Sequence, residues 1–99
     1  MTPADFQGSL TKRTPPSGLS PALAALWWMG RNEWGKAHEL AMGGEAADCA
    51  WVHAHLHRVE GDLDNARYWY RRAGRAPAMG ELTAEWAAIV AALLAAPRP

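Results

Sequence analysis

The chain is rich in residues that form helices and poor in residues that favour strands. Of its 99 residues, 21 are alanine and ten are leucine, whereas there are only three valines, one isoleucine and four threonines. Alanine and leucine are among the best helix formers, while β-branched side chains pack best on the pleated surface of a sheet. The composition therefore predicts an all-α fold, and this length is typical of a single domain.

Five helices are expected from start and stop residues. Ser20 and Pro21 are typical of a helix start and Gly30 of a helix end, so the first helix should cover 21–30. Asn32 should cap a second helix, and Asp62 a fourth that follows Gly61. By the same reasoning the remaining helices should cover 32–42, 45–59, 62–73 and 82–96.

The segment before the first helix has a different composition. Residues 1–19 are rich in proline, glycine, serine and threonine, and their apolar residues follow no helical period. Such a segment is expected to be a loose or disordered arm, followed by a single helical domain at 20–97. The alternative is an arm that folds back onto the helices through Phe6 or Leu10.

A repeat of 29 residues relates the first two helices to the next two. With this offset Ala25 aligns with Ala54, Ala37 with Ala66, and Ala41 with Tyr70. Each copy thus has a small residue on its first helix and another twelve residues later, on its second. Two helices need small residues where their axes cross most closely, so each copy should form a helical hairpin.

This pattern resembles the tetratricopeptide repeat and its Sel1-like relatives. The resemblance is carried by residues 51–77, at Ala54, Gly61-Asp62-Leu63, Ala66, Tyr70, Ala73 and Pro77. The chain departs from the family where His53 and His57 replace large apolar residues, and its period is shorter than the usual length of about 34 residues. The resemblance implies two tetratricopeptide-like hairpins and a C-terminal helix that caps the last one.

The resemblance also implies a function and a surface. Such repeats bind proteins or peptides without catalysis, through residues on the first helix of each hairpin. Carried over to this chain, the expected partner-binding residues are Asp48, Trp51, His55, Arg58, Leu26 and Met29. Tryptophan and arginine are common at binding hot spots, and six tryptophans are more than so small a core should bury. A homodimer that buries some of them is a further expectation.

A second hypothesis is a small metal-binding or thiol protein. Cys49, His53 and His57 follow one another at helical spacing, and two histidines four residues apart suit zinc. Cys49 and His57 are two turns apart, about 12 Å, so one ion would need a ligand from another helix. The alternative is that the two histidines hydrogen-bond across a hairpin, for instance to Tyr70, and that Cys49 is a buried small hydrophobe. No metal or cofactor is therefore expected, and the chain is not expected to be an enzyme.

A third hypothesis is an acidic-ligand or nucleic-acid site at the arginines of segment 67–75. Tyr68 and Trp69 lie among these arginines, and such a surface could bind phosphates and bases. Ten basic residues are balanced by ten acidic ones, however, which disfavours a nucleic-acid partner. The longest apolar run has eleven residues, too few for a membrane span, so a cytoplasmic protein is expected.

Overall fold

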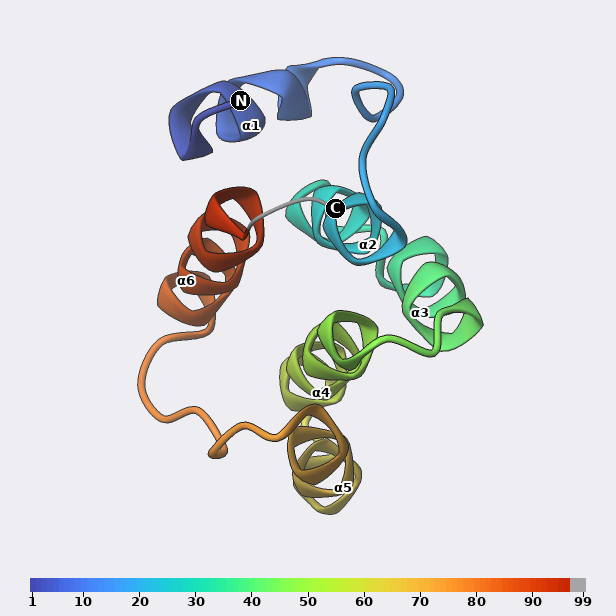
Figure 1. Cartoon of the computed structure of the whole chain (residues 1–99). Coiled ribbons are helices and arrows are strands. Elements are labelled where there is room, and N and C mark those ends of the chain that lie inside the picture. The colour runs from blue at the N-terminus through green and yellow to red at the C-terminus, as the bar shows by residue number, and fades with distance from the viewer. Residues whose placement is uncertain (97–99) are drawn as a thin grey trace.

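A computed structural model describes residues 1–96, which contain α-helices and no strands (Figure 1). The helices are α1 (Pro3–Gly8), α2 (Pro21–Gly30), α3 (Trp34–Gly43), α4 (Ala47–Glu60), α5 (Leu63–Ala73) and α6 (Leu82–Ala95), with a short 3-10 helix, η1, at Ser9–Thr11. The all-α prediction is confirmed, and helices α2 to α6 correspond to the five expected ones. The sixth helix, α1, lies in the segment that was expected to be loose.

The predicted helix ends lie within two residues of those in the structure. The Ser20 hydroxyl accepts the Leu23 N–H at 3.2 Å, and the Asp62 carboxylate accepts the Asn65 N–H at 3.3 Å. Gly61 ends α4 with a φ of 86°, a conformation that costs glycine little. Asn32 was wrongly expected to cap α3. It has a φ of 62° after α2, and Glu33 takes the N-cap position of α3.

Helix α4 is the centre of the molecule. It packs against α3 and α5, and its other neighbours are α2 and α6 (Figure 1). Helices α2 and α3 form one antiparallel pair and α4 and α5 another, and α6 covers the side of α2 and α4 that faces away from their partners. The Trp86 indole N–H of α6 donates to the Leu26 carbonyl at 2.8 Å, which attaches α6 to α2.

The N-terminal segment packs on this core. Phe6 is completely buried, and its ring centroid lies 5.9 Å from that of Trp86. The Trp27 indole N–H donates to the Ser9 hydroxyl at 2.9 Å, and the Arg31 guanidinium donates to the Leu10 carbonyl at 2.6 Å. The arm thus differs from the loose segment expected and follows the alternative in which Phe6 folds back onto the helices.

One apolar stripe differs from its prediction. Leu63, Ala66 and Tyr70 recur at helical spacing, which predicts one buried stripe on α5, but 52% of the surface of Leu63 is exposed. The reason is that α5 lies at the edge of the molecule and packs chiefly on α4. Ala66 and Tyr70 of the same stripe are buried as expected.

Candidate functional site

The six residues expected to bind a partner do not form one open surface. Leu26 and His55 are completely buried, Trp51, Met29 and Arg58 are half-buried, and Asp48 is exposed. The cause is α6, which packs on α2 and α4: its Glu85 carboxylate bonds to His55, and its Trp86 indole bonds to the Leu26 carbonyl. The face that the resemblance assigns to a partner is therefore filled largely by the chain's own last helix.

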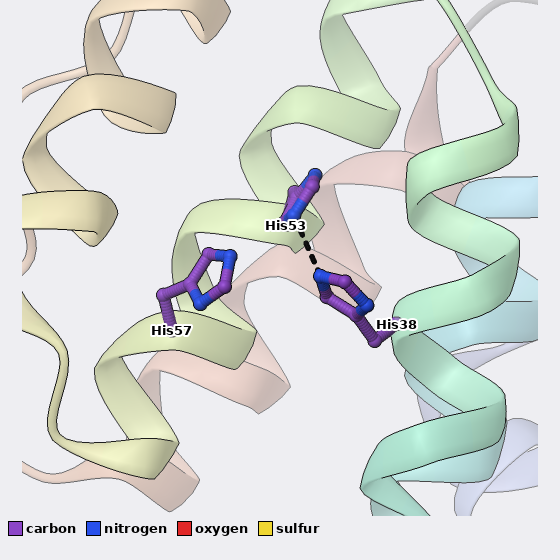
Figure 2. Close-up of side chains that lie close together, drawn as sticks. All are labelled: His38, His53 and His57. Carbon is purple, nitrogen blue, oxygen red and sulfur yellow. Dashed lines mark hydrogen bonds between the residues drawn. The ribbon is translucent and has the colours of Figure 1, made fainter.

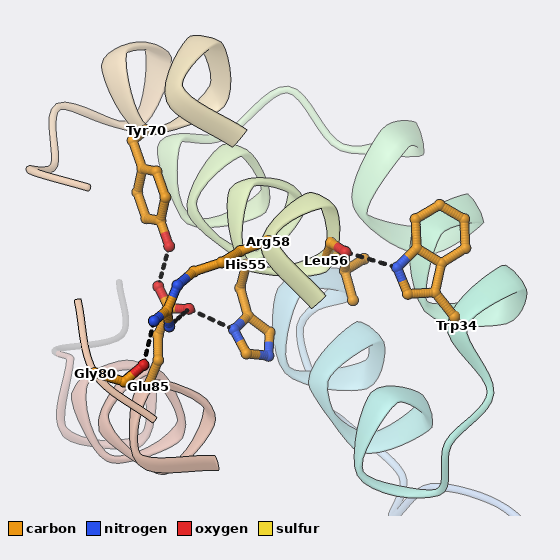
Figure 3. Close-up of polar contacts among 7 residues, drawn as sticks. All are labelled: Trp34, His55, Leu56, Arg58, Tyr70, Gly80 and Glu85. Atoms are coloured by element: carbon orange, nitrogen blue, oxygen red, sulfur yellow. Dashed lines mark hydrogen bonds and ion pairs between the residues drawn. The ribbon is translucent and has the colours of Figure 1, made fainter. Parts of the chain in front are cut away.

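A buried polar network joins α4, α5 and α6 (Figure 3). The Glu85 carboxylate of α6 lies 2.7 Å from His55 Nδ1 and accepts a hydrogen bond from the Arg58 guanidinium at 3.1 Å. It also accepts the hydroxyl of Tyr70, and Arg58 donates a second hydrogen bond to the Gly80 carbonyl. One carboxylate thus holds three side chains from two helices, which explains why His55 and Arg58 turn inward.

The network favours one charge state. Burial alone would raise the pKa of Glu85, but hydrogen bonds from His55, Tyr70 and Arg58 outweigh it and lower that pKa below its usual value. Burial, followed by the hydrogen bond to Glu85, raises the pKa of the Tyr70 phenol. Glu85 is therefore an anion and Tyr70 a neutral donor at neutral pH. A network so enclosed is well suited to holding helices together.

An apolar pocket of about 410 Å³ remains beside α6. Its walls come from α1, η1, α2, α4 and α6, and include Leu10, Met29, Val59, Leu82, Trp86 and His55. Two of the expected partner-binding residues, Met29 and His55, therefore line the same cavity.

The arginines of segment 67–75 are divided among different contacts. Arg67 pairs with Asp64 at 2.7 Å, and Arg72 lies 5.4 Å from the centre of the Trp69 ring. Arg75 lies 3.7 Å from the centre of the Trp51 ring. Trp51, one of the expected partner-binding residues, is therefore already in a cation–π contact within the chain. Arg67 thus has an acidic partner within its own helix, and Arg72 and Arg75 each lie over an aromatic ring.

Three histidines come together between α3 and α4 (Figure 2). His53 Nε2 lies 3.0 Å from His38 Nε2, and the His53 and His57 rings stack with centroids 4.8 Å apart. One ring nitrogen of each of the three lies within 4.8 Å of the others. Cys49 is outside this group and is buried beside Gly44. The expected third ligand from another helix is thus available as His38, whereas Tyr70 is bonded to Glu85 and not to a histidine.

Aromatic rings enclose the histidine cluster. The Trp34 ring stacks on His38 with centroids 4.7 Å apart, and the Trp69 ring stacks on His53 at 3.9 Å. Burial, followed by the two neighbouring imidazoles, lowers the pKa of His53 to about 4, and burial also lowers the pKa of His38. Both rings are therefore neutral at pH 7.

Sequence reasoning missed His38 and Glu85, although each carried a signal. His38 follows Trp34 by four residues and precedes Ala41 by three, which places it beside the buried face of its helix. Glu85 lies between Leu82 and Ile89 at the same kind of spacing, so it is a charge on an apolar stripe. A polar residue in such a position needs a buried partner.

Comparison of the chain with protein-family models, curated proteins and solved structures found no match. The resemblance to tetratricopeptide and Sel1-like repeats therefore stays a prediction. Within residues 1–96, no helix combines the length and the apolar character that crossing a membrane requires.

Proposed function

We propose that the chain is a non-catalytic binding module of helical-repeat type, which holds an apolar side chain of a protein or peptide partner. The observation that carries the proposal is the apolar pocket beside α6, with Met29, Leu82 and Trp86 in its walls. Pockets of this size with apolar walls suit a single large side chain, and such anchors dominate the affinity of many interfaces.

The repeat arrangement belongs to the same proposal and has its own support. The residues paired by the 29-residue offset are all buried: Ala25 and Ala54, Ala37 and Ala66, and Ala41 and Tyr70. Each pair occupies the same place in its hairpin, on the first helix or on the second. Two hairpins built alike are what a duplicated helical unit would produce.

The lining of the pocket favours binding over catalysis. His55 is its one titratable side chain among the described residues, and Nδ1 of that ring is engaged with Glu85. General acid–base chemistry needs a group that can exchange protons with a substrate, usually together with a second such group. This pocket instead offers apolar area, which can bind a side chain but does not supply a reaction.

The experiment is an affinity capture from lysate of the source cells, with two matched variants. Leu82→Arg puts a charge at the pocket, and Leu63→Arg makes the same change at an exposed leucine that also begins a helix. Circular dichroism first checks that both variants fold. A partner held by wild type and Leu63→Arg but lost by Leu82→Arg supports the proposal.

Two results count against this proposal. One is a partner that Leu82→Arg retains as well as wild type does, and the other is no partner specific to wild type. Size-exclusion chromatography with light scattering, run on the same three proteins, identifies the case in which the partner is a second copy of this chain.

A further inference from the structure

We propose that His38, His53 and His57 bind one zinc ion between α3 and α4, a site independent of the apolar pocket. Zinc bonds to imidazole nitrogens at about 2.0–2.1 Å, so tetrahedral nitrogen ligands lie about 3.3 Å apart. The Nε2 atoms of His38 and His53 are already 3.0 Å apart, and the third nitrogen lies within 4.8 Å of both. To surround one ion, the most distant pair of these nitrogens therefore has to close from at most 4.8 Å to about 3.3 Å.

The backbone positions these three rings before any ion binds. His53 and His57 are four residues apart on α4, which places both side chains on the same side of one helix. His38 comes from α3 and points toward them (Figure 2). The set therefore includes the ligand from a second helix that the α4 residues alone do not provide.

The surrounding side chains restrict how the rings can move. Trp34 stacks on His38 and Trp69 on His53, so each of these two rings has an indole against one face. Trp34 is itself held, because its indole N–H donates to the Leu56 carbonyl at 2.7 Å (Figure 3). Rings held in this way lose little further freedom when they bind an ion.

Glu60 supplies the outer partner that metal-binding histidines usually have. His57 Nδ1 lies 2.6 Å from the Glu60 carboxylate, so this ring donates from Nδ1 and keeps the lone pair on Nε2. A carboxylate behind a histidine orients the ring and increases its basicity toward the metal. In Figure 2 a nitrogen of His57 faces the other two rings, as this tautomer requires.

Binding also requires that one proton move. In the structure one of the His38 and His53 rings donates from Nε2 to the other, so that Nε2 carries a hydrogen. When the ion binds, Nε2 of that ring releases its proton to solvent and Nδ1 takes one up, so the ring stays neutral and all three rings offer a lone pair to the ion.

The donor set selects the class of ion. Three imidazoles without a thiolate suit zinc and its neighbours among the divalent transition metals, whereas magnesium and calcium prefer oxygen ligands. His38 is half-buried, so the fourth position faces the solvent side of the cluster and would take a water molecule.

The test uses the full chain, stripped with a chelator and titrated with zinc chloride by isothermal calorimetry. We expect one zinc per chain and at least a tenfold loss of affinity in His38→Gln, which keeps a polar side chain at a half-buried position. Glu39→Gln is the matched control, because it changes an exposed residue of α3 directly beside His38 but outside the cluster, and it should bind zinc as wild type does. Cobalt(II) titrated into wild type should give the visible absorption of a four-coordinate nitrogen site.

A second variant keeps the test decisive if a histidine variant fails to fold. Glu60→Gln changes an exposed residue and should weaken zinc binding by about 10–100-fold, since it removes the outer partner of His57. The proposal is overturned if wild type shows no saturable binding at one zinc per chain. It is also overturned if the folded His38→Gln and Glu60→Gln variants bind zinc as tightly as wild type.

Discussion

Replacement of Glu85 by alanine is the sharpest test of how the helices are held together. The side chain of Glu85 is 6% exposed and accepts hydrogen bonds from three partners. Without it, the polar atoms of His55 and Tyr70 stay buried and lose their acceptor. Arg58 is affected less, because its side chain is 13% exposed and keeps the bond to the Gly80 carbonyl.

The expected loss of stability in Glu85→Ala follows from the hydrogen bonds that are lost and kept. Removing one partner of a buried ion pair costs about 3–5 kcal/mol, mainly because the remaining groups are left desolvated and unpaired. Since Arg58 keeps the Gly80 carbonyl as an acceptor, we expect the lower end, about 3 kcal/mol of unfolding free energy. In a domain of this size each kcal/mol lowers the melting temperature by about 4–8 °C, so the midpoint should fall by roughly 12–24 °C.

Urea unfolding followed by circular dichroism measures the difference, with Glu81→Ala as the control. Glu81 is an exposed glutamate just before α6 whose side chain caps nothing, so its loss should change the free energy by about 0.5 kcal/mol or less. If Glu85→Ala lies within about 1 kcal/mol of wild type, the network does not stabilise the fold and the reasoning is refuted.

The same residue predicts a pH dependence. The pKa of Glu85 is lower in the folded chain than its ordinary value of 4.5, so the folded state holds this carboxylate in its charged form. Its contribution to stability is complete above about pH 4.5 and is lost as the pH falls through the lower folded pKa. As the pH is lowered, the free energy of unfolding should therefore fall more steeply for wild type than for Glu85→Ala. Equal slopes of this free energy against pH in the two proteins would contradict the prediction.

Three further predictions concern other parts of the chain. Phe6→Ala should release α1 and cost up to about 3 kcal/mol, with faster hydrogen exchange confined to the N-terminal segment; unchanged exchange there would contradict the packing of Phe6. Gly61→Ala should lower stability by about 1 kcal/mol because φ is 86°, whereas Gly35→Ala, at a helical position with open space, should be neutral or slightly stabilising; thermal melts that rank them otherwise would contradict this. Burial, followed by the charge of Asp48, raises the pKa of the Cys49 thiol. Ellman's reagent should therefore react slowly with Cys49 until denaturant is added. Rapid reaction of the folded chain at pH 8 would contradict this and would support a function for the thiol.

The helices could be predicted because their ends are set locally. Ser20 and Asp62 cap their own helices, and Gly61 takes a conformation that suits glycine, so a few neighbouring residues were sufficient evidence. Asn32 shows the limit of this approach, because the same residue type also suits the positive φ that follows a helix.

The candidate site was harder to predict because its contacts span the chain. His55 lay on a face expected to be open, yet its partner Glu85 follows 30 residues later on α6. His38 belongs with His53 only because α3 packs against α4, which no local pattern specifies. Phe6 could be named as a residue that folds back, but its partner Trp86 lies 80 residues away, and an aperiodic segment does not identify that partner.

The position of α6 over α2 and α4 has a consequence for the order of folding. The links within each helical pair are short in sequence, at residues 31–33 and 61–62, so these pairs can form early at small entropic cost. The contacts of α6 close much longer loops, such as the 60 residues between Trp86 and Leu26. We therefore expect α6 to dock after the two pairs have formed and to limit the folding rate, and α1, whose Phe6 packs on Trp86, to follow it.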